Sequence, residues 1–385
     1  MIEMLKKMKI LLIVTAALLA VSVLCLGVSL MVEHFGNSGE YVDFGGNNNK
    51  EESGKQPDKP VQTPQSDPGA KTGIALPSAT ATNVYLGGAD ATTKDITDDE
   101  DIKSAAMALL DMTDNRLVAG KNADVKMYPA SMTKVMTLLV ACENAKDPNA
   151  MLTVTADMIS KYASGSNAGG SVAFEWKEGY QVTVEDALHL IIYQSDTFAC
   201  WLIAEHVAGS EAEFVAMMNA KAVNELGLMG THFTNCTGLF NAEHYTTARE
   251  MAAIMAAAMN NTAAATVLQK YDMYTVDIYK NGEAYDTQDM WSGWYTGRLE
   301  QYGYPKTTAY YAGKGSDIRI VSGKTGWEEV PTGCFVTAGV DTVTGRQYVC
   351  VQVGRIDKTQ ITIGSSTSTY DTRVMYQKYA KEPTT

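Results

Sequence analysis

A serine and a lysine stand three residues apart where a long apolar run begins. Residues 129–134 read Pro-Ala-Ser-Met-Thr-Lys and lead directly into the mostly apolar residues 135–140. This pattern predicts a buried helix with two polar side chains on one face of its start, because residues i and i+3 are neighbours on a helix. Ser131 and Lys134 are therefore expected within hydrogen-bonding reach of each other.

That pair can supply a nucleophile together with its base. A serine hydroxyl is a weak nucleophile until its proton is removed, and a lysine accepts a proton only where burial or a neighbouring cation lowers its pKa. Unpaired backbone N–H groups at a helix start also stabilise an oxyanion. Ser-x-x-Lys is common by chance, so the pair alone indicates only a candidate acyl-transfer site.

Two further motifs follow along the chain. Ser195-Asp196-Thr197 comes after the apolar residues 188–193, and Lys324-Thr325-Gly326 comes after residues 317–323, whose alternation predicts a strand. Lys-Thr-Gly on its own is more often a turn than a site. The information lies in the order of the three motifs.

The order Ser-x-x-Lys, Ser-x-polar, Lys-Thr-Gly resembles that of the penicillin-binding proteins and serine β-lactamases. The chain is most similar to the D-alanyl-D-alanine carboxypeptidases among the low-molecular-mass penicillin-binding proteins. The likeness runs from about residue 104 to residue 354 and includes residues 121–124, 129–137, 204–210, 231–239 and 244–249. So many matches in one order make coincidence a poor explanation.

The resemblance implies a serine DD-carboxypeptidase. Such an enzyme removes the terminal D-alanine from peptidoglycan stem peptides through an acyl-serine intermediate, and β-lactams inhibit it covalently. By this resemblance Ser131 is the nucleophile, Lys134 is its base, and Ser195 relays a proton to the departing D-alanine. No cofactor is implied.

The third motif is expected to bind the substrate. By resemblance, Lys324 lies on an edge strand, lowers the pKa of Lys134 and attracts the terminal carboxylate. Thr325 donates a hydrogen bond to that carboxylate. Gly326 lets the substrate lie close to the strand backbone. The backbone N–H groups of Ser131 and Trp327 are the expected oxyanion donors.

One departure from the family concerns Thr197. The family has asparagine at this substrate-binding position, two residues after the second-motif serine, and asparagine offers both a carbonyl and an amide where threonine has one hydroxyl. Substrate positioning is therefore expected to be weaker, and Thr197→Asn is predicted to raise acylation by penicillin. The departure leaves open a catalytically weak peptidoglycan-binding or scaffold protein of the same fold.

A serine β-lactamase is a third alternative. Fast deacylation in the class with this motif order uses a glutamate four residues before an asparagine. If Asn235 is the counterpart of that asparagine, Thr231 occupies the glutamate position. Efficient β-lactam hydrolysis is therefore disfavoured.

Strand patterns lie at both ends of the folded part, with helical patterns between them. Strands are predicted at residues 105–110 and 116–119 and in a hairpin over residues 333–353, helices over 184–259, and a last helix near 370–379. Thr247 and Glu250 form a predicted capping box. These elements indicate an α/β (α+β) fold, an antiparallel sheet packed with a helical cluster. The resemblance implies the β-lactamase/transpeptidase-like fold, with the site where sheet and helices meet.

The N-terminal segment predicts export. Lys6, Lys7 and Lys9 precede the apolar residues 10–32, which suit either a retained membrane anchor or a cleaved signal peptide, and both send the rest of the chain outside. Residues 36–98 are rich in Gly, Ser, Pro, Asn and Asp and predict a disordered spacer. The predicted organisation is residues 1–35 as signal or anchor, 36–98 as spacer and 99–385 as catalytic domain, at the bacterial cell membrane or cell wall.

Charge and cysteine content limit the kinds of ligand that the chain is expected to bind. With 44 acidic and 31 basic residues the chain is a poor candidate for nucleic-acid binding. Five cysteines lie outside the apolar segment, and among them Cys334 and Cys350 could pair, although buried free thiols are favoured. Cysteines and histidines lack the close spacing of a zinc site, so no metal is expected and His206, His232 and His244 are interpreted as structural.

Overall fold

The computed structural model describes residues 71, 73–78, 92–162, 170–269, 273–292, 310–311, 317–327, 333–354 and 365–380. All of them belong to one compact unit, residues 64–385. The predicted signal or anchor lies outside the described residues. Within the described residues, no single helix is long and apolar enough to cross a membrane. The helix pair α7 (Ala248–Asn260) and α8 (Thr262–Gln269) passes the same test only when taken together, and it is bent by 102°.

Two parts of the predicted spacer contact the folded region. Ile74 and Ile96 are buried, and Lys94–Asp95 form a short strand that pairs with residues 119–120. The composition of residues 36–98 therefore does not describe residues 73–78 and 92–98, which pack against the domain. The remainder of the predicted spacer is outside the described residues.

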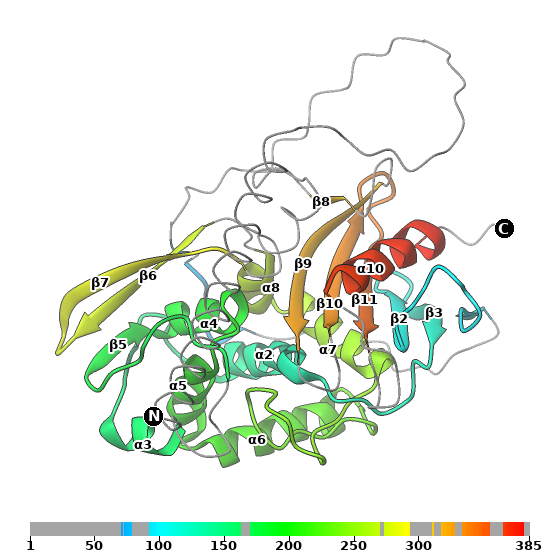
Figure 1. Ribbon diagram of the computed structural model, residues 1–385. Coiled ribbons are helices and arrows are strands. Elements are labelled where there is room, and N and C mark those ends of the chain that lie inside the picture. Colours follow the sequence, from blue (N-terminus) through cyan, green and yellow to red (C-terminus); the bar gives the residue numbers. More distant parts are fainter. Residues whose placement is uncertain are drawn as a thin grey trace, which may run out of the picture. The chain divides into compact units, whose positions relative to one another are not determined.

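A seven-stranded sheet forms one half of the fold (Figure 1). Its order is β1-β3-β2-β11-β10-β9-β8, and every neighbouring pair is antiparallel except β1 with β3. The strands are β1 (Lys94–Asp95), β2 (Ala106–Asp111), β3 (Arg116–Lys121), β8 (Tyr310–Tyr311), β9 (Ile318–Gly326), β10 (Cys334–Asp341) and β11 (Gln347–Val353). The predicted strands near residue 110 and the predicted hairpin over residues 333–353 are confirmed.

Helices cover both faces of this sheet. In β2, Ala108 and Leu110 belong to the core that includes α7 (Ala248–Asn260), whereas Met107 and Leu109 belong to the core that includes α10 (Ser365–Tyr379). Alternate side chains of a strand point to opposite faces, which explains why β2 is apolar at every position from Ala106 to Leu110. The final helix predicted near residues 370–379 is confirmed as the cover of one face (Figure 1).

The other half of the fold is mainly helical, and the predicted helices over residues 184–259 are confirmed except at residues 226–247, which form loops. It contains a second, antiparallel sheet of order β4-β5-β6-β7, which the sequence did not predict as a separate sheet. The elements are α2 (Lys134–Asn144), β4 (Met151–Thr153), α3 (Ala156–Tyr162), β5 (Tyr180–Thr183), α4 (Val184–Tyr193), α5 (Thr197–Ala208), α6 (Glu211–Ala220), α8 (Thr262–Gln269), β6 (Tyr274–Lys280) and β7 (Glu283–Met290).

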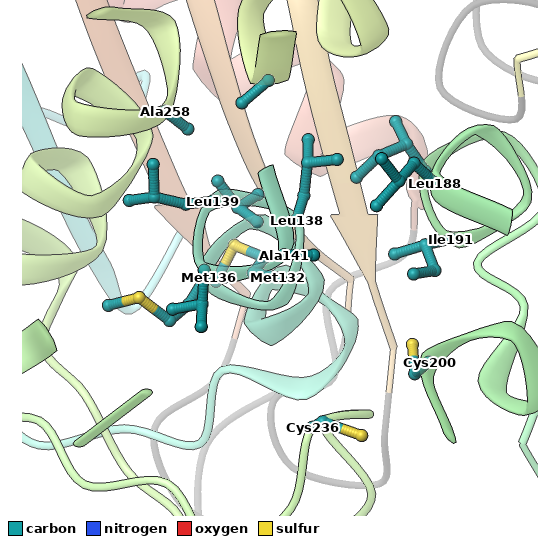
Figure 2. Packing of buried hydrophobic residues seen from close by; sticks show 14 of the residues in the cluster. Met132, Met136, Leu138, Leu139, Ala141, Leu188, Ile191, Cys200, Cys236 and Ala258 are labelled. Carbon is teal, nitrogen blue, oxygen red and sulfur yellow. The ribbon is translucent and has the colours of Figure 1, made fainter. Parts of the chain in front are cut away.

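Helix α2 runs through the middle of the core. Every residue from Lys134 to Cys142 is buried. Figure 2 shows the side chains of α2 surrounded by those of other helices, with Leu188 and Ile191 of α4 on one side and Ala258 of α7 on another. A helix that is apolar on all sides is stable only inside a protein, which explains its place between the sheet and the other helices.

The predicted capping box at α7 forms in one half only. Thr247 Oγ1 accepts a hydrogen bond from the backbone N–H of Glu250 at 3.1 Å and caps the helix. The carboxylate of Glu250 accepts instead from the N–H of Gly230 at 2.8 Å and from Thr231 Oγ1 at 2.5 Å. Glu250 therefore ties the loop before residue 231 to the start of α7.

All five cysteines that the structure describes are buried, and no disulfide joins any two of them: Cys142, Cys200, Cys236, Cys334 and Cys350. The interpretation as buried thiols is confirmed over a Cys334–Cys350 disulfide. Burial raises the pKa of Cys200 to about 12, and it also raises the pKa values of Cys142 and Cys350. Protonated thiols of this kind fill apolar space and are poor nucleophiles.

Candidate active site

Ser131 and Lys134 meet at the start of the central helix. A short 3₁₀ helix, η1 (Ala130–Thr133), leads into α2 and carries Ser131. Ser131 Oγ lies 3.1 Å from Lys134 Nζ, within hydrogen-bonding distance. Ser131 is half-buried and Lys134 is only 2% exposed, so the hydroxyl reaches solvent while the amine lies behind it.

A second loop supports this turn. Lys134 Nζ donates to the carbonyl of Thr237 at 2.6 Å. Gly238 has φ +83° and packs so closely that an ideal Cβ there would lie 2.0 Å from the carbonyl oxygen of Ala130. Asn235 shapes this loop, since its Oδ1 accepts from the N–H of Gly238 at 2.7 Å. Only glycine fits at position 238, because it needs neither a Cβ nor a negative φ.

Sequence reasoning missed the part that Thr237 plays. Every residue has a backbone carbonyl, so the sequence does not indicate that the carbonyl of Thr237 contacts Lys134. The available signal was Gly238, which was noted only as part of a resemblance.

The second and third motifs meet in the same way as the first pair. Ser195 lies in the turn between α4 and α5 with φ 57°, a left-handed conformation that is uncommon for serine. Its Oγ lies 3.0 Å from Lys324 Nζ, which also donates to the carbonyl of Thr325 at 2.7 Å. Ser195 is half-buried and Lys324 is 2% exposed. Again a reachable hydroxyl lies in front of a buried amine.

The end of β9 lies against the turn that carries Ser131. An ideal Cβ on Gly326 would lie 3.1 Å from the backbone nitrogen of Ser131 and 2.6 Å from Cys334 Sγ. The prediction that Lys324 lies on an edge strand needs a correction, because β8 lies outside β9. The pairs of β8 stop at Ile320, so among the described residues the end of β9 from Lys324 onward pairs only with β10.

Electrostatics link the two lysines. Burial, and after it the charge of Lys134, lower the pKa of Lys324 to about 7. Two amines that lie close together resist carrying a positive charge at the same time, because like charges repel. The protonation of Lys134 is therefore linked to that of Lys324. An uncharged amine in this cluster is what proton removal from a serine requires.

Asp196 fixes the backbone around Ser195. Its carboxylate is buried and accepts from the N–H of Ala173 at 2.7 Å, from the N–H of Ala199 at 2.8 Å and from Trp176 Nε1 at 3.1 Å. Burial raises the pKa of Asp196, while these hydrogen bonds and the charge of Lys134 oppose the rise. The carboxylate thus caps α5 and holds residues 173–176 beside the second motif.

The remaining predicted residues differ in their access to solvent. Thr197 is 2% exposed, its N–H donates to the carbonyl of Ser171 at 2.8 Å, and an ideal Cβ on Gly170 would lie 2.2 Å from its Oγ1. Thr325 is half-buried, and Trp327 is 68% exposed directly after Gly326. Thr197 is therefore packed under Gly170, whereas Thr325 and Trp327 border solvent.

Comparison with known proteins agrees with this arrangement. The family described as D-alanyl-D-alanine carboxypeptidase matches residues 92–305, more than half of the chain. The chain is 32% identical over 233 residues to D-alanyl-D-alanine carboxypeptidase DacC of Escherichia coli, covering 57% of this chain and 56% of DacC. It is 35% identical over 150 residues to DacF of Bacillus subtilis, covering 39% of this chain and 37% of DacF. The DacC match spans about half the length of that relative, and the DacF match about a third.

Solved structures share the fold. A Streptomyces DD-transpeptidase superposes with a TM-score of 0.59 at 24% identity, covering 73% of this chain and 98% of that one. A D-alanyl-D-alanine carboxypeptidase from Mycobacterium tuberculosis gives a TM-score of 0.55 at 22% identity, covering 78% of this chain and 98% of that one. The predicted sheet-and-helix fold is confirmed. With its three motifs gathered at the start of α2, the chain belongs to the D-alanyl-D-alanine carboxypeptidase family.

Proposed function

We propose that this protein is a serine DD-carboxypeptidase that removes the terminal D-alanine from peptidoglycan stem peptides. The observation that carries the proposal is the double pairing of a reachable hydroxyl with a buried amine. Ser131 Oγ lies 3.1 Å from Lys134 Nζ, and Ser195 Oγ lies 3.0 Å from Lys324 Nζ. Family membership supports the same reaction class.

In the acylation step, the uncharged amine of Lys134 takes the proton of Ser131. The Oγ then bonds to the carbonyl carbon of the D-alanyl-D-alanine amide, and the C–N bond breaks. Ser195 passes a proton to the leaving nitrogen and takes one from the protonated Lys134 in its place, so that D-alanine departs with a neutral amine. Water then hydrolyses the acyl-serine, which frees the shortened peptide and restores Ser131.

Substrate binding is assigned to the end of β9. The terminal carboxylate of the peptide would interact with Lys324 and accept a hydrogen bond from Thr325, while Gly326 allows close approach to the backbone. Thr197 is proposed to help position the substrate through the residues around it. The N–H groups of Ser131 and Trp327 are the proposed oxyanion donors.

The location follows from the substrate. Proteins of this family work outside the cytoplasm, and β-lactams are their covalent inhibitors. We assign residues 1–35 to a membrane anchor or a cleaved signal, 36–98 mainly to a spacer and 99–385 to the catalytic domain. On this assignment the N-terminal segment would make the membrane contact.

A fluorescent penicillin tests the proposal. Incubation followed by denaturing electrophoresis should give a stable covalent label that Ser131→Ala abolishes, and a synthetic pentapeptide ending in D-Ala-D-Ala should release D-alanine. A label that disappears within seconds would instead indicate β-lactam hydrolysis. An unlabelled protein that still binds peptidoglycan would favour the scaffold alternative.

A further inference from the structure

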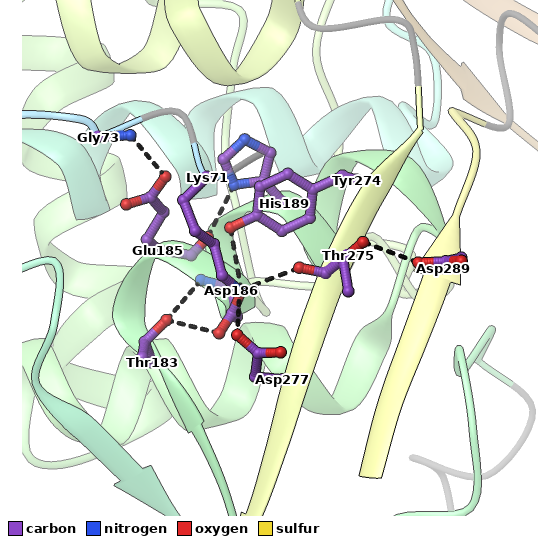
Figure 3. Close-up of polar contacts among 10 residues, drawn as sticks. All are labelled: Lys71, Gly73, Thr183, Glu185, Asp186, His189, Tyr274, Thr275, Asp277 and Asp289. Carbon is purple, nitrogen blue, oxygen red and sulfur yellow. Dashed lines mark hydrogen bonds and ion pairs between the residues drawn. The ribbon is translucent and has the colours of Figure 1, made fainter. Parts of the chain in front are cut away.

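A segment before the predicted catalytic domain lies along two helices that carry the candidate site. We call Lys71 and residues 73–78 the strap. Figure 3 shows how its first part lies against the start of α4 and the adjoining strand β6. Helix α4 ends just before Ser195, and helix α2 begins at Lys134, so both helices have one end at the site.

The first attachment is an ionic one. Lys71 Nζ forms an ion pair with Asp186 in the first turn of α4, donates to the carbonyl of Thr275 at 2.9 Å, and lies 3.2 Å from Asp277 Oδ2 (Figure 3). The Asp186 side chain is fully buried, and Tyr274 also donates to it at 3.0 Å. A buried carboxylate needs a partner cation, and here the strap supplies it.

Further attachments follow along the strap. The N–H of Gly73 donates to Glu185 Oε1 at 2.9 Å, and Ile74 is buried in the main core. At the other end, the N–H of Ser78 donates to the carbonyl of Cys142, in the last turn of α2, at 2.8 Å. Asn261, between α7 and α8, donates to the carbonyl of Ser78 at 2.9 Å. The strap therefore joins the start of α4 to the end of α2.

These two attachments lie far from the reacting groups. An α-helix rises 1.5 Å per residue, so the ten-residue α4 and the eleven-residue α2 each span about 15 Å. Asp186 is at the end of α4 opposite Ser195, and Cys142 is at the end of α2 opposite Ser131. The strap thus ties together the distal ends of the two helices whose other ends carry the site.

We propose that the strap is a positioning element that fixes α2 and α4 relative to each other and thereby aligns Ser131–Lys134 with Ser195–Lys324. The two helices pack rigidly in the core, so a shift at one end is transmitted to the other. Misplacement of reacting groups by about 1 Å costs up to about a hundredfold in rate. The effect on acylation rests on the proposed function, whereas the effect on backbone order does not.

The test uses the full chain and the variants Lys71→Met, Asp186→Asn, the double variant and Lys71→Arg. Lys378→Met is the matched control, because Lys378 is 41% exposed and bridges Asp99 and Asp101 on the α10 side, much as the 37%-exposed Lys71 bridges Asp186 and Asp277. Two quantities are measured at 25 °C: amide hydrogen exchange over residues 131–134 and 194–197, and the rate constant of acylation by fluorescent penicillin.

Lys71→Met should speed exchange in both peptides and lower acylation by about tenfold. Lys71→Arg should restore both, the double variant should be no worse than Asp186→Asn, and Lys378→Met should change neither. Unchanged exchange at residues 131–134 and 194–197 in Lys71→Met overturns the proposal, even if the melting temperature falls. If the parent protein is not acylated at all, the proposed function fails, and hydrogen exchange alone decides on the strap.

Discussion

Nε2 of His244 lies 2.8 Å from Oγ1 of Thr133, a residue that stands between Ser131 and Lys134. On the other side of the ring, Nδ1 accepts from the backbone N–H of Thr234 at 3.2 Å. A nitrogen that accepts from an N–H carries no proton, so the neutral ring has its proton on Nε2 and donates to Thr133. His244 therefore supports the catalytic turn as an uncharged group.

The neutral state of His244 predicts a loss of stability in mild acid. Burial, together with the charges of His232 and Lys134, lowers the pKa of His244 to about 3. Between pH 6.5 and pH 3 the unfolded chain binds a proton here that the folded chain excludes, so the free energy of unfolding falls as the pH falls. From pH 7.5 to pH 5 this one group should cost about 2 kcal/mol.

Urea unfolding at pH 7.5 and pH 5 checks this prediction. The comparison is between the parent protein and His244→Gln, which removes the titrating ring, with His232→Gln as control. The difference between the two pH values should shrink by about 2 kcal/mol in His244→Gln only. An equal difference in all three proteins would show that His244 takes up a proton without unfolding.

Lys324 predicts an alkaline limit on acylation. With its pKa lowered to about 7 by burial and by Lys134, Lys324 loses its charge as the pH rises through neutrality. Penicillin carries a carboxylate, so the second-order rate constant of acylation should fall above pH 7, by up to about tenfold per pH unit. Lys324→Gln should be at least about tenfold slower at pH 7 and should lack this limb. Lys161→Gln, an exposed ion-pair lysine, serves as control, and an alkaline limb that persists in Lys324→Gln would assign it to another group.

Gly238→Ala should displace the turn at Ser131. The new Cβ would lie 2.0 Å from the carbonyl oxygen of Ala130 and 3.0 Å from the nitrogen of Ser131, so the backbone must move. The expected results are a loss of about 3 kcal/mol or more in stability and loss of penicillin labelling.

Gly345→Ala is the matched control for Gly238→Ala. Gly345 has φ +76° with nothing within 4 Å of an ideal Cβ, so alanine there would introduce backbone strain without a steric clash. It should cost only about 1 to 2 kcal/mol and leave labelling intact. Normal labelling in Gly238→Ala would mean that the turn tolerates displacement.

Thr197→Asn is predicted to raise the rate of acylation by penicillin, because an amide can bond the base and the substrate together. The packing around residue 197 leaves little room for asparagine, because an ideal Cβ on Gly170 would already lie 2.2 Å from Thr197 Oγ1. Room for the larger side chain must come from movement of residues 170–171, so a lower melting temperature should accompany the faster rate. Stopped-flow acylation of the parent, Thr197→Asn and Thr197→Ser measures this, and a slower Thr197→Asn contradicts it.

The helices and strands that could be predicted are those whose apolar residues recur with a clear period in the sequence. Ser131 and Lys134 were predicted to meet because their spacing is a helical one, and the strands of the hairpin followed from alternation. The contact of Lys324 with Ser195 spans 129 positions, and only a resemblance could anticipate it.

The missed features are those that residue types do not encode. Thr237 contributes a carbonyl, which every residue has, and Asp196 contributes a carboxylate that reads as an ordinary helix cap. The strap lies in residues 36–98, whose overall composition is polar, yet Lys71, Gly73, Ile74 and Ser78 all contact the folded domain. Tertiary contacts decide such short segments, not their average composition.

The burial of the five cysteines that the structure describes has a practical consequence for a member of a family that works outside the cytoplasm. An oxidising exterior would couple exposed thiols between molecules, but each of these five thiols is enclosed within the fold. A thiol reagent added to the native protein can react with them only when the structure opens, so the speed of modification reports how often it does. The rate at which these five thiols react therefore measures how often the fold opens, and no label has to be engineered into the protein.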